Sequence, residues 1–99
     1  MITFVRTAAI APGKGDEAMA FAHKVARTIE DKTRTKLSVS VPVGGNPFRI
    51  AWIGTYDSLA QLESSWARLM ADADYRSMLL AAGPYFLPGS VHDEMWTIV

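Results

Sequence analysis

The sequence predicts an α+β domain in which one four-stranded antiparallel sheet has helices packed on one face. Two runs are rich in strand-forming residues and are apolar at both odd and even positions, a third run alternates strictly between apolar and polar residues, and two stretches repeat their apolar residues with the period of a helix. The 99 residues have the length of one domain, so we assign residues 1–99 to a single domain.

The chain is predicted to begin with a strand at residues 2–10 and to continue with a helix at residues 15–31. In the first run Ile, Phe and Val are interleaved with Thr and Arg6, so both faces of this strand are expected to be at least partly covered. The segment APGKG then ends the strand. The helix is predicted by the spacing of its apolar side chains, which are Ala18, Phe21, Ala22, Val25 and Ile29.

The middle of the chain has the pattern of a β-hairpin. The run KLSVSV, residues 36–41, alternates between polar and apolar side chains, which is typical of a half-solvated strand. The segment PVGGNP predicts the turn, because Gly44 or Gly45 can adopt a positive φ at little cost. The following strand, residues 48–56, is apolar on both parities and is expected to be covered on both faces.

The last part of the chain predicts a broken helix and a final strand. Ser58 and Gln61 have the spacing of a capping box, so a helix is expected to begin there. The segment ADAD interrupts it with new capping side chains, and a short helix then ends at Gly83 and Pro84. Residues 90–99 form the fourth strand. The apolar face of the first helical part is expected to consist of Leu59, Leu62, Trp66, Leu69 and Met70.

This element order is that of the ferredoxin-like βαββαβ fold, with its second helix broken. The first and third strands are predicted to be central because they are apolar on both parities, while the second and fourth have the polar residues of edge strands, which gives the order 4-1-3-2. Helices on one face leave the other face bare, with large apolar side chains from the central strands. We therefore expect a homodimer formed through this sheet face.

Composition and charge disfavour several classes of partner. Ten basic residues balance ten acidic ones, so no net field attracts phosphate or anionic lipid, and we expect neither a nucleic acid nor a membrane partner. The absence of cysteine excludes disulfides, thiolate nucleophiles and cysteine-held metals. The N-terminal segment lacks the basic-then-apolar order of a signal peptide, and we expect a cytoplasmic protein.

Three segments resemble the dimeric α/β-barrel superfamily. They are APGKGDEAMAF at the first strand-to-helix junction, IGTYDSLAQLE leading into the second helix, and ADADYRSML before the last strand. The superfamily includes cofactor-independent antibiotic-biosynthesis monooxygenases, haem-degrading enzymes and NIPSNAP-like proteins. The resemblance implies two sheets packed face to face in a homodimer, with a small-molecule pocket between each sheet and its helices. The proximal-histidine motif of the haem-degrading branch is not matched, so we expect no cofactor, and no catalytic residue is carried over by motif.

The segment before Trp96 gathers His92, Asp93 and Glu94. On a strand His92 and Glu94 face one way and Asp93 the other, and His23 lies near the solvated side of its helix, so we predict that these residues bind no metal. Two interpretations stay open. In the first, the segment is a solvated or dimer-contact edge strand. In the second, His92 is a catalytic acid or base at a pocket, because imidazole exchanges protons near neutral pH.

The aromatic residues either line a pocket for a planar substrate or pack the core. Trp66 is in register with Leu62 and Leu69, which favours core packing. Trp52 and Trp96 share strand faces with polar neighbours and are the better pocket candidates. The candidate substrate-binding residues are Trp52, Trp96, Tyr56 and Trp66.

These patterns favour a dimeric barrel that binds a small apolar or aromatic molecule. One form of this hypothesis is a cofactor-independent, monooxygenase-like enzyme with Trp52, Trp96 and His92 at one site, since such chemistry needs only a base, a dry pocket and orienting groups. The alternative is a non-catalytic ligand-binding or assembly module whose aromatic residues serve only core and interface. A closed cavity beneath Trp52 and His92 would favour the first reading, and filled space there would favour the module.

Overall fold

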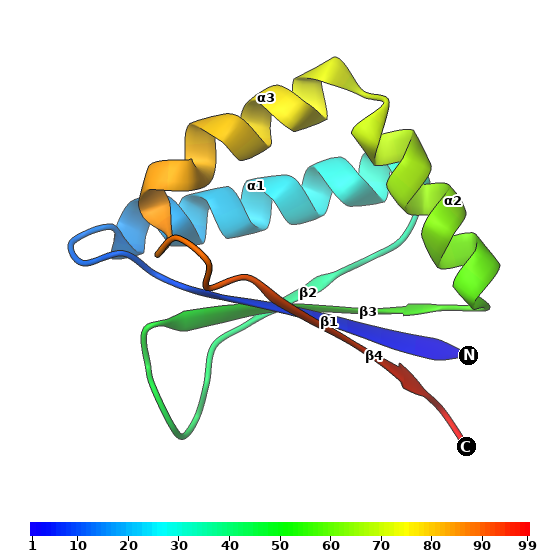
Figure 1. Ribbon diagram of the computed structural model, residues 1–99, viewed down its shortest axis with the longest axis horizontal. Helices are drawn as coiled ribbons and strands as arrows, with labels where there is room; N and C mark the ends of the chain where they lie inside the picture. The colour runs from blue at the N-terminus through cyan, green and yellow to red at the C-terminus, as the bar shows by residue number, and fades with distance from the viewer.

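Four strands form one antiparallel sheet, and three α-helices lie together on one of its faces (Figure 1). The computed structural model describes all 99 residues. The sheet order is β2-β3-β1-β4, which confirms the predicted ferredoxin-like arrangement with the first and third strands in the centre. The elements follow in the order β1 (Ile2–Ala9), α1 (Gly15–Thr33), β2 (Ser38–Ser40), β3 (Arg49–Tyr56), α2 (Leu59–Met70), α3 (Ala73–Ala82), the 3-10 turn η1 (Gly83–Tyr85) and β4 (His92–Thr97).

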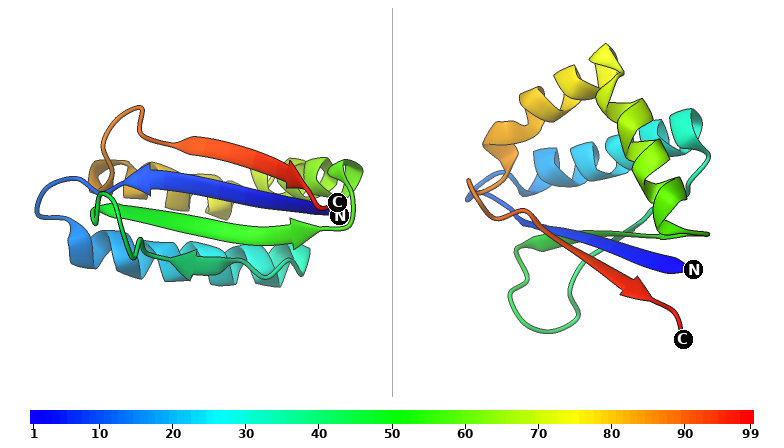
Figure 2. Two further views of the ribbon diagram at one scale, coloured as in Figure 1. Left: turned by 90° about the horizontal axis from the view of Figure 1, so that it is seen from below. Right: turned by 45° about the vertical axis from the view of Figure 1, so that its right-hand side comes forward.

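The register of the two central strands decides which side chains face the helices. Even-numbered residues of β1 pair with even-numbered residues of β3, as Arg6 does with Trp52. Phe4 and Ile50 belong to this set and are buried, so the even-numbered side chains lie beneath the helices. Odd-numbered side chains such as Val5 face the other surface, because side chains alternate along a strand. Figure 2 (left) looks onto that surface, which no helix covers and which we call the open face.

The fourth strand has the reverse parity. Asp93 lies opposite Arg6, so Asp93 is on the helix-facing side, while His92, Glu94 and Trp96 are on the open face. All six residues of β4 are exposed, because β4 is an edge strand that the helices do not reach.

Small side chains on α1 allow this helix to pack closely against the sheet. Ala18 and Ala22 are completely buried, and the indole Nε1 of Trp52 donates a hydrogen bond to the carbonyl of Ala22 at 3.2 Å. This bond satisfies the one polar atom of a buried tryptophan, which is 6% exposed. No helix of the structure has the length and apolar character needed to cross a membrane.

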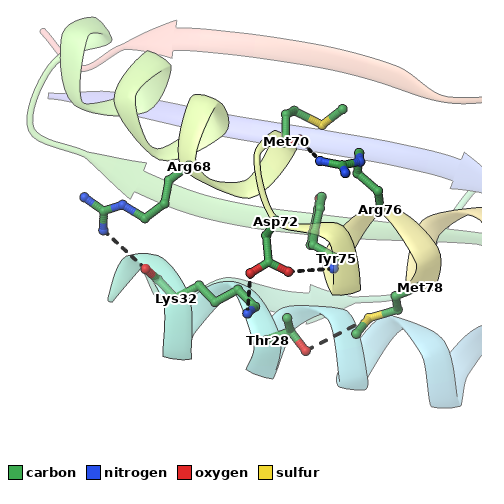
Figure 3. A network of polar contacts seen from close by, with 8 residues as sticks. All are labelled: Thr28, Lys32, Arg68, Met70, Asp72, Tyr75, Arg76 and Met78. Atoms are coloured by element: carbon green, nitrogen blue, oxygen red, sulfur yellow. Dashed lines mark hydrogen bonds and ion pairs between the residues drawn. The ribbon is translucent and has the colours of Figure 1, made fainter.

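One aspartate connects the helices to each other. The side chain of Asp72 caps α3 by accepting a hydrogen bond from the backbone N–H of Tyr75 at 2.8 Å, and its second oxygen accepts one from Nζ of Lys32 at 2.7 Å (Figure 3). The hydrogen bond from Lys32 is the largest cause that lowers the pKa of Asp72 below its usual range. The side chain of Arg68, on α2, donates to the carbonyl of Lys32 at 3.2 Å. The end of α1 and the α2–α3 corner are therefore held together, and Tyr75 follows directly from that corner.

Several of the predicted elements are longer than the observed ones. The second strand was expected over residues 36–41 but contains only Ser38–Ser40. Leu37 turns inward instead and packs against Gly54, where an added Cβ would lie 2.4 Å from the leucine Cδ2. Gly54 is thus a site of close approach between this segment and the central strand.

The prediction for the apolar face of α2 is correct only for residues in the middle of the helix. Leu62 and Leu69 are buried, but Leu59 and Met70 are exposed because they are the first and last residues of the helix. Ser65 is buried although the pattern placed it outside that face. The predicted cap is confirmed, since the Ser58 side chain accepts a hydrogen bond from the Gln61 backbone N–H.

The connection between β2 and β3 extends away from the helices, on the side of the open face (Figure 1). Its tip contains Gly45, whose φ of 79° is in the left-handed region, as predicted for one of the two glycines. Gly44 has no positive φ, and a Cβ at either glycine would meet no atom within 4 Å.

We predict that Gly45→Ala lowers stability while Gly44→Ala does not. A Cβ at a left-handed position costs about 1 kcal/mol, and no steric clash adds to this cost. In a domain of this size the loss corresponds to a fall of roughly 4–8 °C in Tm. Thermal unfolding of the two variants tests this, and equal Tm values would show that the loop relaxes without strain.

Candidate functional site

A cavity lies between the sheet and the three helices. Its volume is about 70 Å³, several times the roughly 10–15 Å³ that one water molecule needs. Every lining side chain is hydrophobic except one, which is an arginine. The lining residues come from the two central strands, the three helices and the segment before β2, and they are Phe4, Arg6, Phe21, Val25, Ile29, Leu37, Trp52, Tyr56, Trp66, Leu69, Tyr75 and Leu79.

The cavity lies where the hydrophobic core is divided. The larger cluster contains Trp52 and Tyr75, and a separate small cluster contains Phe4, Tyr56 and Leu62. Members of both clusters line the cavity. Protein interiors normally fill such space, so a gap bounded by two buried clusters is a feature to be explained.

Arg6 is held in a fixed position at the cavity wall. Its Nε and Nη2 donate to the two carboxylate oxygens of Asp93 at 2.7 and 2.8 Å, which is a bidentate pair. The guanidinium carbon lies 4.3 Å from the ring centroid of Trp66 and 5.7 Å from that of Phe4. Stacking and ion pairing together fix the plane of the guanidinium, and Nη1 is left for another acceptor.

An open groove adjoins the cavity on the side of β4 and α2. It has a volume of about 330 Å³ and is lined by Leu62, Glu63, Asp93 and Met95 together with three residues that also line the cavity, namely Phe4, Arg6 and Trp66. The Arg6–Asp93 pair therefore lies where the outer groove meets the inner cavity. The side chains of the pair are 24% and 35% exposed, so solvent reaches this boundary.

Two tyrosines supply the remaining polar groups of the cavity wall. Burial is the largest cause that raises the pKa of both Tyr56 and Tyr75 above the ordinary value of 10.0. The positive charge of Arg6 lowers both pKa values to a smaller extent, as does a hydrogen bond from Thr35 at Tyr56. At neutral pH both hydroxyls are therefore protonated and act as hydrogen-bond donors.

The structure divides the predicted site between the two faces of the sheet. Trp52, Tyr56 and Trp66 line the cavity on the helix-facing side. His92 and Trp96 lie on the open face, and Trp96 is 60% exposed. The expectation that Trp52, Trp96 and His92 meet at one site is therefore wrong, because β4 pairs with β1 in the register that places Asp93, and not His92, beside the cavity.

The residues on the open face of β4 interact with one another. One carboxylate oxygen of Glu94 lies 3.0 Å from Nε2 of His92, and the other accepts a hydrogen bond from Nε1 of Trp96 at 3.1 Å. The predicted shared face of His92 and Glu94 is confirmed by these contacts. The structure contains no group of three or more His, Asp or Glu side chains placed to hold a metal ion, and the proposal that the protein binds no metal stays a prediction.

The predicted site included only three of the twelve residues that line the cavity, and it lacked the charged Arg6 and the hydroxyl-bearing Tyr75. A signal for Arg6 was available, because a charge between Phe4 and Ala8 on a strand expected to be covered on both faces requires a partner and a defined environment. Tyr75 had no such signal. Its position depends on the cap at Asp72, which turns α3 back over the sheet.

The fold and the cavity define a ferredoxin-like α+β protein with an apolar cavity beneath its helices. No protein-family model matches the sequence, and no curated protein sequence matches it. The structural likeness to proteins of the NIPSNAP family extends over the full chain. An uncharacterised NIPSNAP domain protein from Burkholderia xenovorans superposes with a TM-score of 0.85 at 18% identity, covering 100% of this chain and 95% of the other.

Two further solved structures are similar. A NIPSNAP family protein of unknown function from Agrobacterium tumefaciens has a TM-score of 0.81 at 20% identity, covering 97% of this chain and 86% of the other. A protein described as a "putative antibiotic biosynthesis monooxygenase" from Nitrosomonas europaea has a TM-score of 0.76 at 8% identity, covering 100% and 99%. At these identities the likeness establishes the fold and leaves the activity open.

We predict that the two buried tyrosines make the protein lose stability at alkaline pH. Their pKa values are higher in the folded than in the unfolded chain, so this contribution is complete below pH 10 and is lost as pH rises through the folded-state values. Lys32, whose pKa is also raised by its bond to Asp72, adds a loss in the same direction.

The tyrosine contribution is measured by comparing variants in urea unfolding between pH 8 and pH 11. Tyr75→Phe is expected to flatten the alkaline fall in the free energy of unfolding, while Tyr85→Phe, outside the cavity, retains the wild-type slope. Identical slopes for all three proteins would contradict the assignment of Tyr75 to a desolvated site.

Proposed function

We propose that this protein binds a small apolar or aromatic molecule in the cavity between its sheet and its helices. The observation that supports this most directly is the composition of the cavity wall, which combines aromatic rings from both halves of the core with a single fixed cation. Ligand sites in proteins typically have this form, with an apolar lining and few polar groups that orient the ligand. The cavity, at about 70 Å³, is smaller than the roughly 150 Å³ of an apolar cavity that holds benzene, so a one-ring ligand also occupies part of the adjoining groove.

The alternative of a purely structural assembly module is less well supported. That reading expects the space beneath Trp52 to be filled by side chains, whereas Trp52 and Phe21, which pack edge to face, both line a cavity. Leaving such space empty costs dispersion contacts on every lining side chain. A ligand that fills it recovers those contacts.

A second candidate function is cofactor-independent oxygenation, favoured by the similar fold of the Nitrosomonas protein described above. Oxygenation without a cofactor begins when a base removes a proton from the substrate. The predicted base, His92, lies on the open face, and the cavity presents only Arg6 and two tyrosines whose raised pKa values keep them protonated. The residues of the cavity thus favour binding and orientation over proton abstraction.

We also propose that the protein works as a homodimer joined through the open face. This face presents Val5 and Ile53 from the central strands, and the exposed side chains of Trp96, Val43 and Phe48 border it from β4 and from the projecting loop. A patch of this kind on an uncovered sheet is typical of an interface. A second copy supplies a matching surface through two-fold symmetry.

We predict that toluene binds to the cavity and that Leu79→Trp abolishes this binding. Leu79 lines the cavity, so an indole at this position occupies the space of the ligand. Leu80→Trp is the matched control, because the neighbouring side chain is 81% exposed. Ligand-observed NMR measures binding, and circular dichroism verifies that both variants are folded.

If the folded wild-type protein shows no binding of toluene or of the polar aromatic probes used below, the proposed function is wrong. If Leu79→Trp and Leu80→Trp retain binding equally, a ligand site exists elsewhere and the cavity is not the site.

We predict that the wild-type protein sediments as a dimer and that Ile53→Asp sediments as a monomer. In a two-fold interface the substitution places two carboxylates in the contact, and both must lose water. Leu80→Asp, on α3, is the control that adds the same charge on the helical side. Sedimentation velocity distinguishes the states, and a wild-type monomer at micromolar concentration would exclude this interface.

A further inference from the structure

We propose that the ligand of the cavity is a small aromatic molecule with one carboxylate group, which Arg6 binds in place of Asp93. The inference rests on the proposed function and specifies its ligand class. It follows from the position of Arg6, from the exchangeable nature of its present partner and from the donors that surround it.

Because of its position, Arg6 is the group that distinguishes a negatively charged ligand from a neutral one. It is the only charged side chain of the cavity wall. A neutral apolar ligand leaves the guanidinium with no new partner, whereas a carboxylate matches its planar fork of donors. The ring of Trp66 beneath the guanidinium keeps this fork oriented, so little side-chain freedom is lost when an anion binds.

The partner of Arg6 has the properties of a group that can be displaced. Asp93 belongs to β4, the edge strand whose residues are all exposed, and its side chain lines the outer groove and not the cavity. When it releases Arg6, its carboxylate can turn to water. Exchange of one carboxylate for another keeps the charge balance at the guanidinium, and both side chains of the present pair are partly exposed to solvent.

The tyrosine hydroxyls supply further donors. Tyr56 and Tyr75 line the same cavity as Arg6, and the charge of Arg6 acts on both hydroxyl groups, so the three groups share one environment. A carboxylate has about four acceptor positions, more than a single guanidinium uses. Aromatic rings at Trp66 and Phe4 then contact the remainder of the ligand.

Benzoate, benzamide and toluene form a series that separates charge from shape. Benzoate and benzamide are nearly equal in size, and only benzoate is an anion at pH 7.5. We expect benzoate to bind the wild-type protein about tenfold or more tightly than benzamide, because charge-assisted hydrogen bonds are about twice as strong as neutral ones. Isothermal titration calorimetry and ligand-observed NMR measure the three affinities.

Two variants with opposite expected effects on the affinity for benzoate test the roles of Arg6 and Asp93. Arg6→Gln is expected to remove the preference for benzoate while benzamide and toluene still bind. Asp93→Asn is expected to strengthen benzoate binding several-fold without changing benzamide binding, because it removes the competing carboxylate. Arg49→Gln is the matched control, since this arginine lies on the neighbouring central strand but on the open face, and it is expected to leave all affinities unchanged.

The outcomes distinguish this inference from the proposed function. Equal affinities for benzoate and benzamide, or weaker benzoate binding by Asp93→Asn, overturn the carboxylate assignment while toluene binding still supports the cavity as a site. Absence of binding by all three probes overturns both. If Arg6→Gln does not fold, the Asp93→Asn comparison decides alone.

Discussion

One charged side chain on the helix-facing side of the central strand, Arg6, belongs to both the cavity and the open groove beside it. Arg6 lies between Phe4 and Ala8 beneath the helices, where an unpaired guanidinium would be costly. The carboxylate of Asp93, on the edge strand, pairs with this guanidinium, and the ring of Trp66, on α2, stacks on it. The pair lies at the boundary between the cavity and the open groove, where it remains partly exposed to solvent.

The remaining walls of the cavity follow from how the helices are held. Close packing of α1 on the sheet is possible because alanines face Trp52, and the hydrogen bond from that indole to Ala22 fixes their relative position. The capping interaction at Asp72 joins α3 to Lys32 of α1. It brings Tyr75 over the sheet from the far side of the cavity. Backbone capping and helix packing thus both position the residues that line the cavity.

Sequence patterns predicted the elements and the strand order because both depend on local periodicity and on which strands are apolar on both parities. The composition of the site was predicted only for Trp52, Tyr56 and Trp66. The register of β4 against β1 places Asp93 opposite Arg6, and a shift by one residue would exchange the faces of the entire strand. The alternation within residues 90–99 does not say which parity faces the helices, because that depends on pairing with a strand at the other end of the chain; His92 therefore lies on the open face and not at the cavity, although its shared face with Glu94 was predicted correctly.

Alternation along the strands separates two kinds of surface on the same four elements. Even positions of β1 and β3 face the cavity and its arginine, and odd positions face the uncovered side of the sheet. On that side Glu94 satisfies both His92 and the indole N–H of Trp96, so these polar atoms are already paired before any partner covers them. A partner that covers them therefore has no unsatisfied donor to accommodate, and the large exposed ring of Trp96 adds apolar contact area. The segment HDE thus has side chains on both faces, since Asp93 lies beside the cavity in the outer groove while His92 and Glu94 interact on the open face.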